Sequence, residues 1–114
     1  MNPAQVKILG KIYQFRYIPD CPELETQHWG FCEHDKCRIT VCDGVDQQQL
    51  KDTILHETLH ALEFGLNTDL TEEQVTVLAT GLYGLFQDNP NLIRWLLGDG
   101  AQAQHQTVHA TTQF

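Results

Sequence analysis

The chain of 114 residues is long enough for one modest hydrophobic core and too short for two, so we expect a single domain. Hydrophobic residues make up 41% of the chain and charged residues 19%, which is typical of globular proteins and excludes a disordered one. The 7 basic and 15 acidic side chains give a formal net charge of −8. This balance argues against nucleic acid as a partner, because phosphate binding needs a basic surface.

No apolar run approaches the roughly 18 residues that a membrane-spanning helix needs. The first residues also lack the basic segment and the apolar segment of a signal peptide. We therefore expect no membrane association and a cytoplasmic protein. In that compartment the four cysteines are expected to be thiols or metal ligands rather than a disulfide framework.

A β-strand is predicted at residues 11–18, which are rich in β-branched and aromatic side chains and are bounded by glycine and proline. Alternation along this strand places three aromatic side chains on one face: Tyr13, Phe15 and Tyr17. Residues 6–9 favour a short preceding strand or a turn. Residues 20–25 favour a loop, because the segment is acidic and is interrupted by proline.

A β-hairpin is predicted next, with strands at residues 29–33 and 36–42 joined by a tight turn near His34. In such a hairpin Cys32 and Cys37 would lie almost directly opposite each other. An oxidisable cross-strand pair is therefore one alternative for these two cysteines.

The longest predicted helix runs from Gln47 to about Phe64, with Asp46 as its N-cap and Gly65 as its C-terminal stop. A short loop leads to a capping box at residues 71–74, which predicts a second helix ending near residue 87. A third, short helix is predicted up to residue 97, opened by an Asn-Pro pair and stopped by glycine.

The last residues of the chain, 98–114, are rich in Gln, Thr, Ala and His and have no hydrophobic periodicity. We interpret this segment as a flexible tail, so that residues 1–97 form the domain. His105 and His109 have helical spacing, but no acidic partner or apolar face accompanies them, which favours a solvated tail over a metal site.

The long helix contains the pattern H-E-x-x-H at His56, Glu57 and His60. The two histidines lie about one turn apart and can reach a single tetrahedral zinc ion. Glu57 can lean over the open side of the metal, where a base for its water is needed. The opposite side of the helix is expected to anchor it in the core through three apolar residues: Leu55, Leu59 and Leu62.

A catalytic zinc ion needs a third protein ligand. The longer motif with a third histidine is excluded, because Leu66 stands at the required position. Glu63 follows on the same helix, too far along the axis to close a compact site. The start of the second helix is better placed, since the short loop returns the chain antiparallel to the first helix. An acidic residue there can face the histidines, and Glu72 is favoured over its neighbour Glu73 because it shares a face with the apolar residues of that helix.

These two motifs resemble the gluzincin-type zinc metallopeptidases, and most closely the small ImmA/IrrE-like family of phages and bacteria. That family has H-E-x-x-H followed by E-x-x-A-x-x-F-A on a second helix, where this chain reads Glu72-x-x-Val75-x-x-Leu78-Ala79. The resemblance covers roughly residues 50–90. It implies an α+β, zincin-like fold, in which a small, mostly antiparallel sheet packs on the active-site helix and a second helix supplies the third ligand.

By this resemblance the chain would be a zinc-dependent endopeptidase acting on a protein or peptide substrate. His56, His60 and Glu72 would hold the zinc ion, and Glu57 would act as the general base. An extended substrate would pair with an edge strand, which we predict at residues 36–41. The alternative is a non-catalytic, zinc-stabilised module of phage or bacterial origin that binds a partner protein. For a phage-encoded chain, the compartment would be the host cytoplasm.

Four cysteines fall within 22 residues: Cys21, Cys32, Cys37 and Cys42. A second, structural zinc site would explain this clustering and would stabilise a small domain. Their spacing contains no Cys-x₂-Cys pair of the kind found in zinc knuckles. Ordinary thiols are therefore favoured over both a structural zinc site and a Cys32–Cys37 pair.

Overall fold

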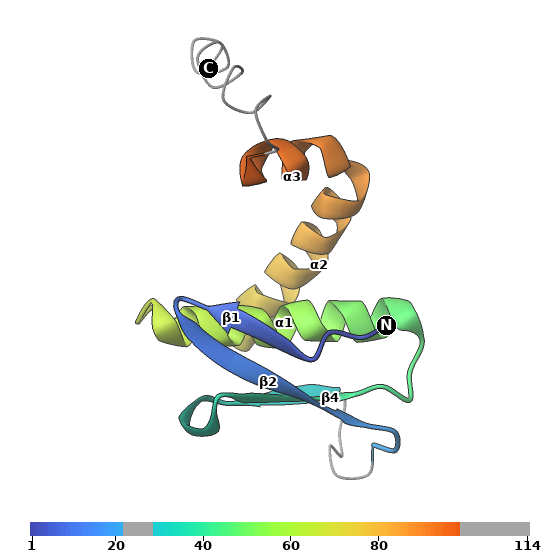
Figure 1. The fold of residues 1–114 in the computed structure, drawn as a ribbon, viewed down its shortest axis with the longest axis vertical. Helices are drawn as coiled ribbons and strands as arrows, with labels where there is room; N and C mark the ends of the chain where they lie inside the picture. Colours follow the sequence, from blue (N-terminus) through green and yellow to red (C-terminus); the bar gives the residue numbers. More distant parts are fainter. Residues whose placement is uncertain (22–28, 99–114) are drawn as a thin grey trace. The chain divides into compact units, whose positions relative to one another are not determined.

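The computed structural model describes residues 1–21 and 29–98 and has an α+β fold, as the sequence predicted (Figure 1). One mixed sheet contains four strands: β1 (Gln5–Ile8), β2 (Lys11–Ile18), β3 (Gly30–Glu33) and β4 (Arg38–Cys42). Three helices follow: α1 (Gln47–Gly65), α2 (Glu72–Asp88) and α3 (Pro90–Leu97). The predicted tail, apart from Gly98, lies outside the described residues.

Contacts divide the chain into two compact units, Met1–Gly81 and the residues from Leu82 onward. The first unit contains the sheet, α1 and the first part of α2. The second contains the end of α2 and α3. No helix in residues 1–21 and 29–98 is long and apolar enough to cross a membrane.

The strands of the sheet follow the order β1-β2-β4-β3. β1 pairs antiparallel with β2, and β3 pairs antiparallel with β4, whereas β2 and β4 are parallel. The prediction that residues 36–41 form an edge was therefore wrong, because β4 is an inner strand and β3 lies at the edge. Four of the five residues of β4 are buried, which fits a strand with neighbours on both sides.

The two hairpins depend on backbone conformations with positive φ. Leu9 (φ 49°) and Gly10 (φ 89°) form the two-residue turn between β1 and β2, in which positive φ matches the twist of the strands. Between β3 and β4, a short 3₁₀ turn at His34–Lys36 is closed by Cys37 (φ 49°).

The second hairpin corrects the predicted pairing of its cysteines. Cys37 lies within the turn itself, and Cys32 stands opposite Ile39 in the register of β3 and β4. The expectation that Cys32 faces Cys37 across the strands was therefore wrong. The reason is that the connection takes up four residues, 34–37, which is two more than the tight turn predicted near His34.

A disulfide joins Cys21 to Cys42, with Cα atoms 5.9 Å apart, while Cys32 and Cys37 are free. The expectation of thiols or metal ligands was wrong for the first pair. The pairing is possible because Cys42, the last residue of β4, lies beside Ile18, the last residue of the parallel strand β2. Cys21 follows Ile18 by three residues. Among the described residues, the cysteines form no group that could hold a metal ion.

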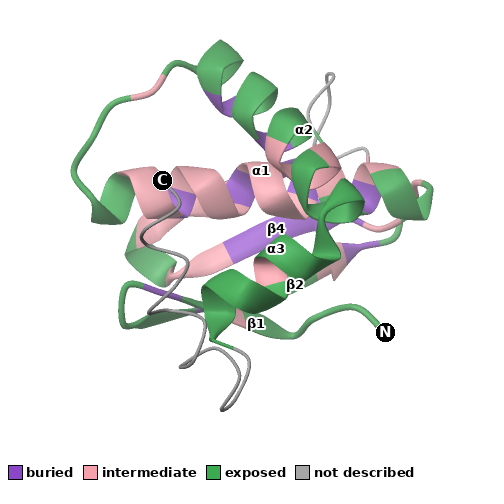
Figure 2. Ribbon diagram, turned by 90° about the horizontal axis from the view of Figure 1, so that it is seen from above, coloured by how far each residue is buried: buried purple, intermediate pink, exposed green. Residues whose placement is uncertain are grey.

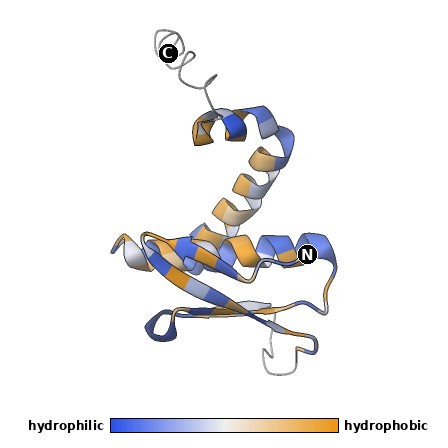
Figure 3. Ribbon diagram, viewed as in Figure 1, coloured by the Kyte–Doolittle hydropathy of each residue, from blue (hydrophilic) through white to orange (hydrophobic). Residues whose placement is uncertain are grey.

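The sheet and α1 enclose the core of the first unit. Burial alternates along β2, and Tyr13, Phe15 and Tyr17 all contact this core, so the three aromatic side chains share one face as predicted. Figure 3 shows that hydrophilic and hydrophobic residues are interspersed along β2. Figure 2 shows buried residues along β4 and on the face of α1 that lies over it.

The buried stripe of α1 differs from the predicted one. It consists of Leu50, Thr53, Glu57 and Ala61, which are three or four residues apart. Leu62 packs against the edge of the core, but Leu55 and Leu59 are only half-buried. The acidic residue of the motif, rather than these leucines, therefore lies in the most buried stripe of the helix.

The two ends of α1 are built differently. Asp46 caps the first turn, as predicted, because its carboxylate accepts a 2.8 Å hydrogen bond from the amide of Gln49. Gly65 is the last helical residue, and the positive φ (56°) falls at Asn67 instead. A Cβ at Gly65 would lie 2.8 Å from Cδ1 of Leu9, so a larger residue there would displace the end of that exposed side chain.

The predicted capping box opens α2. The amide of Gln74 donates to Oγ1 of Thr71 at 3.0 Å, and the amide of Thr71 donates to Oε1 of Gln74 at 2.9 Å. Val75 and Ala79 on the same helix are fully buried. These contacts set the rotation of the first turn of α2, from which Glu72 projects.

The second unit shows the predicted third helix, with Pro90 in its first turn and Gly98 (φ 77°) at its end. Asn89 does not cap it through a side-chain bond, because its Nδ2 donates to the carbonyl of Leu85 in the preceding helix. None of the residues of α3 is buried.

Candidate metal site

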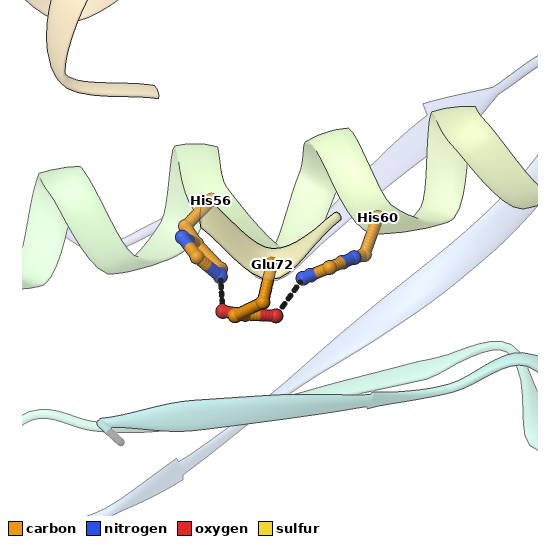
Figure 4. Close-up of side chains that lie close together, drawn as sticks. All are labelled: His56, His60 and Glu72. Carbon is orange, nitrogen blue, oxygen red and sulfur yellow. Dashed lines mark hydrogen bonds and ion pairs between the residues drawn. The ribbon is translucent and has the colours of Figure 1, made fainter. Parts of the chain in front are cut away.

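His56 and His60 project from consecutive turns of α1 toward the carboxylate of Glu72, which lies in the first turn of α2 (Figure 4). Nε2 of His56 lies 2.6 Å from Oε2 of Glu72, and Nε2 of His60 lies 2.9 Å from Oε1. The two imidazole rings meet edge to face, with centroids 4.9 Å apart. All three side chains belong to the first unit.

The three side chains have the donor set and the spacing of a metal site. Their ligand atoms, one from each residue, all lie within 4.8 Å of one another. Ligands of a tetrahedral zinc ion with bonds of about 2.0–2.1 Å lie about 3.3 Å apart, so only small shifts would be needed to seat an ion among them. It is the only group of three or more such residues within residues 1–21 and 29–98.

Glu72, rather than Glu73, is the acidic residue that the structure brings to the two histidines. The capping box fixes the rotation of the first turn, and Glu73 does not belong to the group of ligand atoms. Burial acts to raise the pKa of Glu72, but the charges of His56 and His60 and their hydrogen bonds outweigh it and hold the pKa below its usual range. The carboxylate is therefore ionised at neutral pH, as a metal ligand must be.

Glu57 lies beside this group with only 6% of its surface exposed. The pKa of its carboxyl is raised to about 7, mainly by burial; the charge of His60 opposes the rise, and nearby Glu72 adds to it. A general base works best when its pKa lies near the operating pH. The sequence predicts Glu57 as a base, and a pKa near 7 would let this carboxyl both accept and release a proton near neutral pH.

Glu63 contacts His60 at the ring nitrogen that faces away from Glu72, and this contact was not predicted from the sequence. Oε1 of Glu63 lies 3.2 Å from Nδ1 of His60, and Oε2 accepts a 2.7 Å hydrogen bond from the amide of Leu70. The hydrogen bond from Leu70 is the main reason that the pKa of Glu63 lies below its usual range, and the contact with His60 lowers the pKa further, although burial opposes both. Glu63 follows His60 by three residues in the sequence, so a contact between them was predictable, but Glu63 was considered only as a metal ligand.

A cleft of about 320 Å³ opens over the group and is lined by His56, Glu57 and Glu72 together with Trp29. Trp29 precedes the edge strand β3, which packs closely on α1 because its first residue is glycine. A Cβ at Gly30 would lie 3.0 Å from Cγ2 of Thr53 on α1. The edge of the sheet therefore runs beside the cleft.

Three polar aromatic side chains of the first unit do not belong to the group of possible ligands. Tyr13 is 2% exposed and belongs to the core, and the hydroxyl of Tyr17 donates to the carbonyl of Pro3. His34 stacks on Phe64 with ring centroids 4.1 Å apart. Burial and the charge of His60 lower the pKa of His34. Each of these three side chains thus has a packing role.

Comparison with models of protein families, with curated proteins and with solved structures finds no match for this chain.

Proposed function

We propose that this protein is a zinc-dependent metallopeptidase. The observation that carries the proposal is the convergence of His56, His60 and Glu72 on one point, with the buried carboxyl of Glu57 beside it. Two imidazoles and one carboxylate form a donor set of catalytic zinc sites, which use three protein ligands and leave the remaining position open. The choice of zinc rests on this donor set, and the choice of peptide bonds rests on the resemblance to the ImmA/IrrE-like family.

His56, His60 and Glu72 would hold the ion, which when bound supplies Lewis-acid chemistry for activating water and polarising a carbonyl. Glu57 would take the proton of the attacking water and later deliver it to the leaving amine. A pKa of about 7 suits both steps, because the carboxyl can accept a proton and give it up again near neutral pH. The cycle returns Glu57 to its starting charge.

The edge strand β3 is the place where we expect an extended substrate to bind. An edge strand presents unpaired amides and carbonyls, and a peptide can add to it as a further strand. Trp29 precedes this strand and lines the cleft together with two of the proposed ligands, His56 and Glu72, so a bound peptide would pass the site. The role assigned from sequence to residues 36–41 thus passes to Gly30–Glu33.

The decisive variant is Glu57→Gln, which keeps the size of the side chain and removes the base. The zinc-loaded protein and the variant are incubated with an unfolded protein such as casein, and the fragments are counted by mass spectrometry. Loss of a general base lowers the rate by about 10²- to 10⁴-fold. We expect a loss of at least 100-fold with zinc content unchanged, whereas Glu73→Gln should cut as fast as the parent protein.

Two results would contradict the proposal. Equal cleavage by Glu57→Gln and the parent protein would remove Glu57 from the reaction. A protein that binds zinc and cuts no peptide would favour the alternative, a zinc-stabilised module that binds a partner.

A further inference from the structure

The side chain of Glu63 is the only one in the described chain that joins a proposed zinc ligand to the loop before α2. One of its oxygens lies 3.2 Å from Nδ1 of His60 and the other accepts the amide of Leu70 at 2.7 Å. Only 13% of the side chain is exposed, so water competes weakly for either contact. Both oxygens of this carboxylate are therefore used in contacts with other residues.

The first contact sets the orientation of an imidazole. A histidine that binds a metal through Nε2 must carry its proton on Nδ1, and an acceptor there fixes both the tautomer and the plane of the ring. Nε2 of His60 is the nitrogen that faces Glu72. The carboxylate of Glu63 lies against Nδ1 of the same ring, so it favours the tautomer that leaves Nε2 free for a metal.

The second contact sets the path of the chain into α2. The carbonyl of Glu63 accepts the amide of Thr68 at 3.1 Å, and its carboxylate accepts the amide of Leu70. The same residue thus bonds to the loop at two points. Leu70 comes two residues before Glu72, so a shift of this loop would move the third ligand.

We propose that Glu63 is a positioning residue that aligns two of the three zinc ligands at once, His60 through its ring and Glu72 through the loop. This inference rests on the proposed function for its metal, but its hydrogen bonds belong to the chain itself. It predicts that removing one carboxylate weakens zinc binding without removing any ligand.

The test compares Glu63→Ala with the parent protein and with Glu73→Ala, which removes an exposed carboxylate beside Glu72. Zinc affinity is measured by competition with a chromophoric chelator. Loss of an outer-shell partner of a metal ligand costs about 10- to 100-fold in affinity, and we expect a loss in this range for Glu63→Ala. Glu73→Ala should bind zinc within about threefold of the parent protein, as surface changes usually do.

Two readouts separate positioning from a general loss of structure. In chelator-treated protein, hydrogen exchange at the amide of Leu70 should be slow and should speed up at least about tenfold in Glu63→Ala. In zinc-loaded protein, ¹⁵N spectra of His60 should show a protonated Nδ1 that exchanges slowly with water, and the variant should lose that slow exchange. Glu63→Gln retains one acceptor oxygen, so its zinc affinity should fall between that of the parent protein and that of Glu63→Ala.

The outcomes are distinct. Parent-like zinc affinity and parent-like exchange at Leu70 in Glu63→Ala would overturn the inference. If the alanine variant does not fold, Glu63→Gln decides in its place, and parent-like values in that variant overturn the inference equally. If the parent protein binds no zinc, the proposed function fails. In that case rapid exchange at the amide of Leu70 in the parent protein overturns the positioning role of Glu63 as well, whereas slow exchange that depends on Glu63 supports that role.

Discussion

The two units of the chain differ in how far their apolar side chains are buried. All the buried hydrophobic residues of the described chain lie in Met1–Gly81, including the fully buried Ile39, Val41 and Val75. In Leu82–Gly98 no residue is buried, and α3 exposes large side chains such as Trp95 (36%) and Leu97 (79%). The first unit therefore has a hydrophobic core of its own, whereas the second has none within the described residues.

The candidate site lies entirely in the unit with the core, and this location has a physical reason. Glu57 occupies the buried stripe of α1 between Leu50 and Ala61, and burial is what raises its pKa. Val75, one turn after Glu72, packs without exposure and so fixes the helix that carries the third ligand. Close packing thus holds the side chains of the candidate site in place.

The largest expected effect is on the core of the first unit. Leu50→Ala removes a side chain that is 2% exposed and should destabilise the protein by about 4 kcal/mol through lost burial and a residual cavity. Leu96→Ala makes the same change at a site that is 61% exposed in the second unit and should cost at most about 0.5 kcal/mol. Urea unfolding followed by far-UV circular dichroism compares the two. Equal losses would contradict the contrast between the units.

The disulfide of the first unit should contribute the next largest effect. Cys21 and Cys42 are 21 positions apart, and closing a loop of this length stabilises a fold by about 3 kcal/mol. Cys21→Ala should lower stability by roughly that amount under oxidising conditions, whereas Cys37→Ala, which replaces a free cysteine, should change it little. Dithiothreitol should destabilise the parent protein and leave Cys21→Ala unchanged. A parent protein that is insensitive to reductant would argue against the bond.

The buried carboxyl of Glu57 should make the stability of the first unit depend on pH. Its pKa is raised from 4.5 to about 7, so the folded protein holds a proton that the unfolded chain releases between these values. Stability contributed by this proton is present at low pH and is lost as the pH rises through that window. Glu57→Gln does not ionise, so its stability relative to the parent should rise by up to about 3 kcal/mol from pH 4.5 to 7.5. Unfolding is measured in the presence of a chelator. A difference that is constant with pH would mean that the carboxyl is solvated.

The smallest effect is expected from removing the third helix. A chain ended after Asp88 lacks α3 and keeps all the residues of the site. Its zinc affinity should stay within about threefold of the parent value, since none of the residues of α3 is buried and none belongs to the site. Chelator competition measures both proteins. A loss of tenfold or more would show that the second unit takes part in the site.

Local patterns made the helices predictable, because their end signals lie close together in the sequence. The helix caps are hydrogen bonds between residues three positions apart, from Asp46 to Gln49 and between Thr71 and Gln74. The start of α3 is marked by a single residue, Pro90. The same holds for His56 and His60, whose spacing on one helix defines their relation to each other.

What the sequence did not reveal depends on contacts between distant segments. The place of β4 inside the sheet, the Cys21–Cys42 bond and the depth of Glu57 are all set by how strands and helix pack. Glu63 was missed for a related reason, since the amide that it binds comes from a loop whose path no local pattern describes. Glu72 was predictable from the sequence because it shares a helix face with Val75 and Ala79, and the structure brings Glu72 rather than Glu73 to the histidines.

X-ray absorption at the zinc edge would show whether His56, His60 and Glu72 together hold one zinc ion. The protein is loaded with one equivalent of zinc, and the shell of nearest neighbours is fitted. We expect one ion per chain, bound by two imidazole nitrogens and by oxygen at about 2.0–2.2 Å, with the signal lost in His60→Ala. Sulfur neighbours at about 2.3 Å would assign the metal to the free cysteines, and a protein that binds no zinc would overturn the proposed site.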